Sequence, residues 1–130
     1  MPFNSPGAPS SLRYFIAEQK SILVVSIVGS MVRENTGIME EMLHQISEKS
    51  AKWIILNLRD VPPSNDRTVC PILAKLKKAA RTRAACVRFT SVHPELRKFL
   101  ESQGVVRPDE FSNNLAEALQ TLLVLEKAAA

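Results

Sequence analysis

The chain has 130 residues, of which 45% are hydrophobic and 23% are charged, and its formal net charge at pH 7 is +4. This length and composition fit one globular domain with a single core, and they exclude an intrinsically disordered chain. The mild basic excess can favour nucleic acid, anionic lipid or an acidic protein partner, although a solvated surface with a few additional lysines accounts for it more simply.

The terminal segments, the longest apolar stretch and the cysteines indicate in which compartment the protein is expected. Residues 1–11 have neither a basic start nor an apolar stretch, so we expect a flexible leader and not a signal peptide. A single domain over residues 12–127 and a short tail, 128–130, should follow. The longest apolar stretch, residues 22–28, is too short to cross a bilayer, which indicates a cytoplasmic protein without membrane insertion. Cys70 and Cys86 lack the spacing of a zinc or redox motif and are expected to be buried free thiols.

The first half of the chain alternates strand-like and helix-like patterns. Two β-rich runs, residues 12–17 and 22–28, are separated by four polar residues and predict a hairpin that Gly29 ends. An apolar stripe that includes Ile38 then predicts a helix from Asn35 or Thr36 to about Lys49. The near-continuous apolar run at residues 53–58 is typical of a strand that is covered on both faces, as in a parallel sheet.

The second half continues this alternation. A helix is predicted over about residues 68–83, with a late start or a distorted first turn because of Pro71. The remaining expected elements are a strand at 85–90, a helix at 94–102, a short edge strand at 105–106 and a last helix that begins near 114. Strands joined by crossover helices indicate an α/β fold with a largely parallel sheet.

Four segments in this order and at this spacing resemble the STAS domain, the fold of the anti-sigma-factor antagonists. They are the strand that ends at Gly29, the central strand and turn at residues 53–61, a proline-helix-glycine segment at 93–105, and a phenylalanine followed by the last helix at 111–119. The similarity covers about residues 12–123. It implies a mixed, largely parallel sheet of four to five strands with about four helices packed on it, and a non-catalytic regulatory domain that binds proteins.

The resemblance places the family's switch in the loop before the second helix, where a partner kinase phosphorylates a Ser or Thr that follows an Asp. Here the corresponding pair is Asn65 and Asp66. Asp66 has no hydroxyl and carries a negative charge near a helix N-terminus, so we expect either a switch position held in a phosphorylated-like charge state or a simple helix cap. Thr68 and Ser64 are nearby hydroxyls that could replace it as phosphorylation sites, with Thr68 expected to act mainly as a helix cap.

The resemblance also implies docking through this loop and the following helix. Candidate partner-binding residues are Asp60, Arg67, Lys75 and Lys78, and the basic run of the helix also contains Lys77, Arg81 and Arg83. We expect a protein partner, such as an anti-sigma factor, a kinase-like regulator or an assembly subunit, that is steered by charge. The sequence does not decide whether the domain forms a homodimer. Nucleic acid is disfavoured because Trp53 and Phe89 are expected in strand cores and not on a basic surface.

No known catalytic or metal-binding motif accompanies these features. His44 and His93 form no recognisable catalytic set and are expected at the surface or at a helix boundary, and four glycines provide no phosphate loop. We therefore expect neither an enzyme nor a cofactor or metal site. The first alternative to a regulatory domain is a structural STAS subunit or scaffold in a lipid-transport or stress-signalling assembly. The second is a basic nucleic-acid-associated protein.

Overall fold

The computed structural model describes residues 11–129. Its strands are β1 (Arg13–Gln19), β2 (Ile22–Val28), β3 (Trp53–Asp60), β4 (Cys86–Thr90) and β5 (Phe111–Ser112). Its helices are α1 (Thr36–Ser47), α2 (Cys70–Thr82), α3 (Pro94–Ser102) and α4 (Leu115–Ala129), with 3-10 turns η1 (Arg33–Asn35), η2 (Arg67–Val69) and η3 (Pro108–Glu110). Of the expected leader only Ser11 lies within the described residues. Two residues of the expected tail belong to α4, and Ala130 lies outside the described part.

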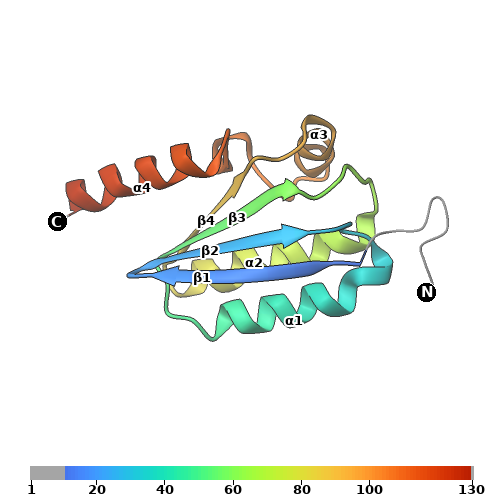
Figure 1. Ribbon diagram of the computed structural model, residues 1–130, viewed down its shortest axis with the longest axis horizontal. Coiled ribbons are helices and arrows are strands. Elements are labelled where there is room, and N and C mark those ends of the chain that lie inside the picture. Colours follow the sequence, from blue (N-terminus) through green and yellow to red (C-terminus); the bar gives the residue numbers. More distant parts are fainter. Residues whose placement is uncertain (1–10, 130) are drawn as a thin grey trace.

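The five strands form one sheet in the order β1-β2-β3-β4-β5. β1 is antiparallel to β2, and every later neighbour is parallel, because each later connection contains a helix that returns the chain to the same edge. Figure 1 shows this arrangement, with β1 and β2 joined as a hairpin. The mixed, largely parallel sheet of five strands with four helices confirms the expected fold class.

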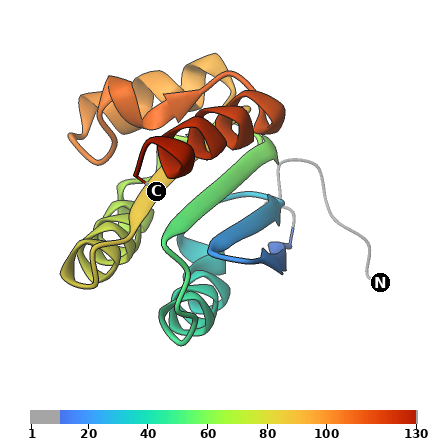
Figure 2. The same cartoon turned by 90° about the vertical axis from the view of Figure 1, so that its left-hand side faces the viewer.

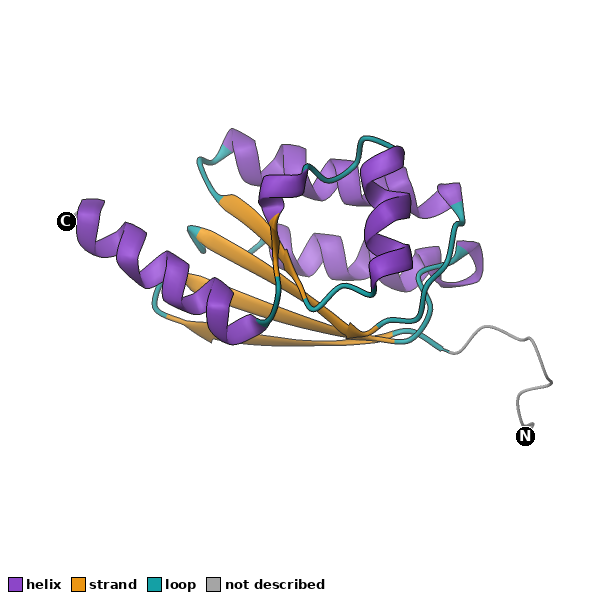
Figure 3. Cartoon of the chain, turned by 90° about the horizontal axis from the view of Figure 1, so that it is seen from above, coloured by secondary structure: helices purple, strands orange, loops and turns teal. Residues whose placement is uncertain are grey.

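The helices cover both faces of the sheet. α1 and α2 lie on one face and α4 on the other, which is visible when the molecule is turned (Figure 2) and when it is seen from above (Figure 3). The side chains of β3 alternate accordingly, since successive residues of a strand point to opposite faces. Ile54 and Leu56 belong to the main core under α1 and α2, and Ile55 belongs to a second, small core with Ala118 and Leu122 of α4.

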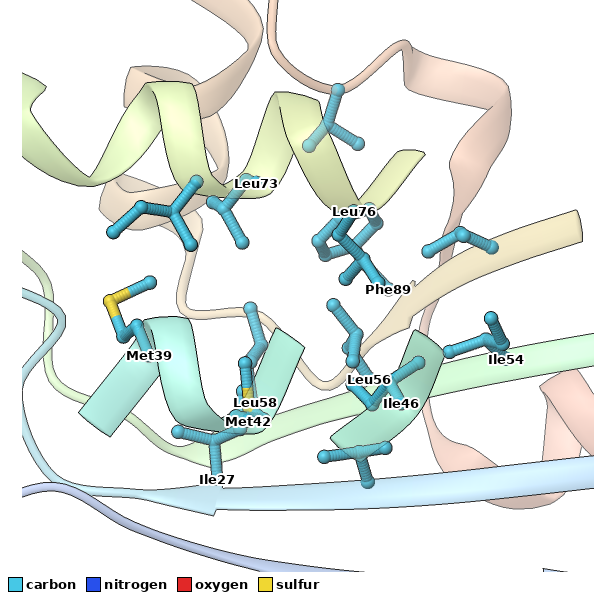
Figure 4. Close-up of a cluster of buried hydrophobic side chains, with 14 of the residues drawn as sticks. Ile27, Met39, Met42, Ile46, Ile54, Leu56, Leu58, Leu73, Leu76 and Phe89 are labelled. Atoms are coloured by element: carbon cyan, nitrogen blue, oxygen red, sulfur yellow. The ribbon is translucent and has the colours of Figure 1, made fainter. Parts of the chain in front are cut away.

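The main core is built from aliphatic, methionine and phenylalanine side chains that are almost completely buried. α1 contributes Met39, Met42 and Ile46, which pack toward Leu73 and Leu76 of α2 and toward the sheet (Figure 4). Each such side chain, when fully buried, stabilises the fold by roughly 1.5–3 kcal/mol. Ile38 differs from the expectation, because it is 37% exposed on the flank of α1 beside β1.

Gly29 ends β2 for a specific steric reason. Its φ is +112°, and a Cβ atom there would lie 2.2 Å from the carbonyl oxygen of Ser11. Only glycine fits this position. Any other residue would be strained at this positive φ, and its Cβ would clash with the backbone of Ser11.

The expected edge strand at residues 105–106 is wrong. Val105 instead donates its N–H to the carbonyl of Leu100 at 3.1 Å, after Gly104 has turned the chain with a φ of +71°. This bond closes the C-terminus of α3, so the Val105 backbone is not used for strand pairing. The edge strand is β5, in which Phe111 pairs with Phe89.

The cysteines are free, as expected, but neither of them is fully buried, so that part of the expectation is wrong. Cys70 is half-buried at the start of α2, and Cys86 is exposed at the start of β4. Cys86 shares the sheet face that α4 covers, at the first residue of its strand, and burial on that face is incomplete there. Among residues 11–129, no helix is both long and apolar enough to cross a membrane.

Candidate partner-binding site

The loop between β3 and α2, residues 61–69, is called the switch loop below. It ends in η2, and α2 begins at Cys70 with Pro71 in its first turn. A proline is tolerated there because the N–H that it lacks would have no partner within the helix. The expectation of a late start or a distorted first turn is confirmed, because α2 begins at Cys70, after the 3-10 turn η2.

Asp66 caps the 3-10 turn with its carboxylate. Oδ1 accepts hydrogen bonds from the backbone N–H of Thr68 at 3.0 Å and from the Thr68 hydroxyl at 2.6 Å. Oδ2 accepts a bond from the backbone N–H of Arg33, in the loop before α1, at 2.8 Å. The expectation that Thr68 is the helix cap is therefore wrong, because Thr68 lies inside the 3-10 turn that precedes α2 and donates to Asp66, which caps that turn.

Asp66 makes one of three contacts that tie the end of β3 and the switch loop to residues 29–33. Gly29 donates its N–H to the carbonyl of Asp60 at 3.1 Å, and the Ser64 hydroxyl donates to the carbonyl of Met31 at 3.0 Å. The bond from Arg33 to Asp66 completes the series. The segments that precede α1 and α2 are thus held together by three hydrogen bonds, and the third of these depends on the carboxylate of Asp66.

The hydrogen bonds also fix the charge of Asp66. The Thr68 hydroxyl, and after it the backbone N–H groups of Arg33 and Thr68, lower the pKa of the Asp66 carboxyl below its ordinary value. Asp66 is accordingly a permanent anion at neutral pH. It accepts hydrogen bonds with both oxygens, and it offers no hydroxyl to a kinase.

The other residues of the switch loop differ in their exposure. Asn65 and Thr68 are exposed, and Ser64 is half-buried. The Thr68 hydroxyl already donates to Asp66, and a phosphate at that place would face the Asp66 carboxylate. Ser64 is held by the carbonyl of Met31. Phosphorylation of either residue stays a prediction.

The four candidate partner-binding residues divide into separate places. Arg67 and Lys78 line the same groove beside α2, together with Cys70, Pro71 and Gly104. Lys75 lies on the other flank of α2, where its Nζ is 3.8 Å from Glu40 of α1. Asp60 lies at the end of β3, next to Gly29. The fold brings Arg67 and Lys78 together and separates Lys75 from them.

Two members of the basic run are structural. The Lys77 ammonium lies 2.6 Å from Oε1 of Glu110 and 2.8 Å from the carbonyl oxygen of Val105, and the lysine side chain is only 13% exposed. Arg83 donates to the carbonyls of Ser47 and Ile46 at the end of α1. Local sequence carried no signal for these contacts, because the partners lie 28 or more positions away.

The argument against nucleic-acid binding rested on the burial of two aromatic residues, and the structure supports it for only one of them. Phe89 is fully buried, as expected. Trp53 is half-buried and lines a groove with Lys77, Arg81, Arg88 and Arg107, so it does lie beside basic side chains. The cause is its place as the first residue of β3, on the face of α4, where the cover by that helix is incomplete.

The histidines lie where the sequence predicts. His93 caps α3, since its Nδ1 accepts the N–H of Glu95 at 3.3 Å, and the exposed His44 lies 3.7 Å from Glu48. Within the described chain, no three His, Cys, Asp or Glu residues are grouped so that they could hold a metal ion.

Comparison with protein families agrees with this geometry. The sequence model of the STAS domain matches residues 15–118. The chain belongs to the STAS domain family. No curated protein matches the sequence.

Solved structures of STAS proteins have the same fold. An anti-sigma factor antagonist from Mycobacterium paratuberculosis has a TM-score of 0.75 and 18% identity, over 88% of this chain and 96% of that one. Moorella thermoacetica RsbS, with a serine replaced by glutamate, has a TM-score of 0.72 and 20% identity, over 88% and 98%. A sulfate transporter family protein from Wolinella succinogenes has a TM-score of 0.72 and 18% identity, over 85% and 92%. At these identities the similarity establishes the fold.

Proposed function

We propose that this STAS domain is a non-catalytic, cytoplasmic regulatory module that binds a protein partner through the switch loop and the adjoining part of α2. The observation that carries the proposal is the position of Asp66. The sequence resemblance assigns it to the family's phosphorylated position, and its carboxylate holds the switch loop against the loop before α1. A serine kinase has no acceptor at position 66, so this position keeps one charge state.

The proposed docking surface consists of Asn65, Arg67 and Lys78, with Asp60 and Lys75 at its margins. Arg67 and Lys78 line one groove and are both exposed, and each is a flexible cation that a carboxylate of a partner could pair with. Rim charges of this kind mainly set the rate and salt dependence of association.

The test compares Asp66→Ser with the unchanged protein in a pull-down from the native cell, with Lys98→Glu as a control for a surface change on α3. Serine restores a hydroxyl and removes the fixed charge, so we expect a gain or loss of a specific partner. A kinase-like anti-sigma factor among the captured proteins would support the regulatory assignment. An unchanged set of partners would contradict the role of Asp66.

A structural subunit of an assembly is the second candidate. A structural role needs no phosphorylation, which suits an aspartate at position 66, and one of the similar folds comes from a sulfate transporter family protein. Capture of a transporter ATPase in the same pull-down would support this candidate. Abundant nucleic acid without any protein would instead support a nucleic-acid-associated protein.

Mass spectrometry of the protein from its native cell tests the substitute acceptors. We expect Thr68 and Ser64 without phosphate, because both hydroxyls donate within the fold and Thr68 adjoins a carboxylate. A phosphate on Thr68 would show that the switch survives at a shifted position.

A further inference from the structure

The sheet has an incompletely paired edge at β4, and the switch loop does not cover it. β5 contains two residues, and it pairs with Phe89 and Thr90 only. The first three residues of β4, Cys86–Arg88, pair with β3 on one side, and no strand of the described chain pairs with them on the other. In Figure 2 this strand lies at the margin of the sheet, with α2 on one face and α4 on the other.

The backbone of this edge is oriented for strand addition. Cys86 donates its N–H to the carbonyl of Lys52, on the side of β3. Because neighbouring residues of a strand direct their backbone groups to opposite edges, Val87 directs its N–H and carbonyl toward the open side. An unpaired edge of this kind is the template that extended peptides use when they add a strand to a sheet.

A groove of about 360 Å³ runs along this edge, and it is called the β4-edge groove below. Its charged lining comprises Lys77, Arg81, Arg88, Arg107, Asp109 and Glu110, an excess of two positive charges. Lys77 is paired with Glu110, and Arg107 with Asp109 at 3.5 Å. Arg81 and Arg88 have no carboxylate partner among the described residues, and they are the cations that remain for a ligand.

These two arginines flank the edge from opposite faces. Arg81 projects from α2, which covers the main core. Arg88 shares the other face with Trp53 and Cys86, and its Nε donates to the Ser112 hydroxyl at 3.3 Å. A strand added beside Val87 would direct alternate side chains to these two faces, so acidic residues at successive positions would each meet an unpaired cation.

We propose that the β4-edge groove binds an extended acidic segment of a partner protein, paired through its main chain with Val87 and through its carboxylates with Arg81 and Arg88. The occupant follows from charge complementarity with the two unpaired arginines and from the unpaired backbone between them. The groove contains none of the residues named for the proposed docking surface. Lys77 and Arg81 also line the groove of Arg67 and Lys78, so this second contact would adjoin the first.

The test measures binding of a fluorescein-labelled peptide in which pairs of adjacent glutamates are separated by threonines, so that both faces of the added strand carry carboxylates. Binding is followed by fluorescence anisotropy with the purified full chain. A peptide with lysine in place of glutamate and a single-stranded DNA oligonucleotide serve as competing probes. We expect binding of the acidic peptide that weakens as salt is added, together with a shift of the Val87 amide signal in the ¹⁵N NMR spectrum. Preferential binding of the oligonucleotide, or no binding of the acidic peptide, would overturn the proposal.

Variants locate the contact. Arg81 is exposed and has no ion-pair partner in the described chain, so Arg81→Glu should fold normally and weaken peptide binding by about tenfold or more. Arg88→Gln should weaken it by a smaller factor, because the side chain can still donate a hydrogen bond. Lys98→Glu makes the same charge reversal on α3 and should leave binding unchanged. Equal affinities for the Arg81→Glu and Lys98→Glu proteins would overturn the proposal, and this outcome is independent of the pull-down that tests Asp66.

Discussion

Oδ2 of Asp66 accepts the backbone N–H of Arg33 at 2.8 Å, across 33 positions of the chain. The same carboxylate caps the turn before α2 through Thr68. One side chain thus positions the starts of two helices relative to each other. A serine or threonine at this position would have a single hydroxyl oxygen in place of the two carboxylate oxygens.

Replacement of Asp66 should separate the two loops without unfolding the core. In Asp66→Ser, the hydroxyl can still accept from Thr68 as an N-cap, but it cannot also accept from Arg33. We expect faster hydrogen exchange at the Arg33 amide and unchanged exchange at core amides such as that of Leu56. Equal protection of the Arg33 amide in both proteins would show that the bond contributes nothing to the loop contact.

The ionisation of Asp66 predicts a dependence on acid. Its pKa in the folded protein is lowered, so the stabilisation that it provides is complete above the ordinary pKa of an aspartate, about 3.9. It is lost as the pH falls through the lowered folded pKa. In an NMR titration, the Arg33 and Thr68 amide signals should move together with a midpoint below 3.9. Separate midpoints, or a midpoint above that value, would contradict the shared carboxylate.

The pair formed by Lys77 and Glu110 should matter more for stability than the pair formed by Lys75 and Glu40. Both side chains of the first pair are nearly buried, at 13% and 12% exposure. Removal of Lys77 would leave the Glu110 carboxylate with the exposed Arg107 as its only cation within 4 Å among the described residues. Lys77→Ala should lower the free energy of unfolding by about 3 kcal/mol. The exposed pair of Lys75 and Glu40 is the matched control, and Lys75→Ala should change the free energy of unfolding by less than about 1 kcal/mol.

Urea unfolding of both variants checks these values. The double variant Lys77→Met/Glu110→Leu removes the two charges together, and it should lose less stability than the sum of the corresponding single variants. Similar losses for Lys77→Ala and Lys75→Ala would show that the first pair is as well solvated as the second.

The two cysteines should react at different rates. Burial raises the pKa of the Cys70 thiol, and it outweighs the opposing effect of Arg67, so the reactive thiolate of Cys70 is scarce at neutral pH. Cys86 is exposed. Titration with a chromogenic disulfide should consume one thiol quickly and the second slowly, and Cys86→Ser should remove the fast phase. Loss of the slow phase in that variant would reverse the assignment.

Periodicity predicted the elements that are defined by local pattern. The apolar run at β3 and the stripes of α1 and α2 were sufficient for the order of strands and helices, because each pattern repeats within one element. The edge strand was misplaced since Val105 and Val106 have strand-like side chains, while the C-terminus of α3 takes the N–H of Val105. β5 has two residues, which is too short for any periodic signal.

The site was predictable only where the family resemblance applied. The resemblance indicated Asp66, but it contained nothing about Arg33 or Met31, since those contacts join segments that are remote in sequence. The basic run of α2 likewise did not indicate which of its cations are neutralised. Lys77 pairs with Glu110, 33 positions away, whereas Arg81 has no ion-pair partner in the described chain. Side-chain identity specifies charge, whereas the fold decides which charges remain unneutralised.

β3 has a consequence of its own, because its alternate residues belong to two cores. Ile55 is sealed by Ala118 and Leu122 of α4, while the adjacent Ile54 and Leu56 are sealed by the helices of the opposite face. A strand that is clamped from both sides cannot shift toward one helix layer without opening a void in the other. The place of β3 between the two helix layers is therefore fixed by packing from both faces, and the residues of one strand contribute to the stability of both cores.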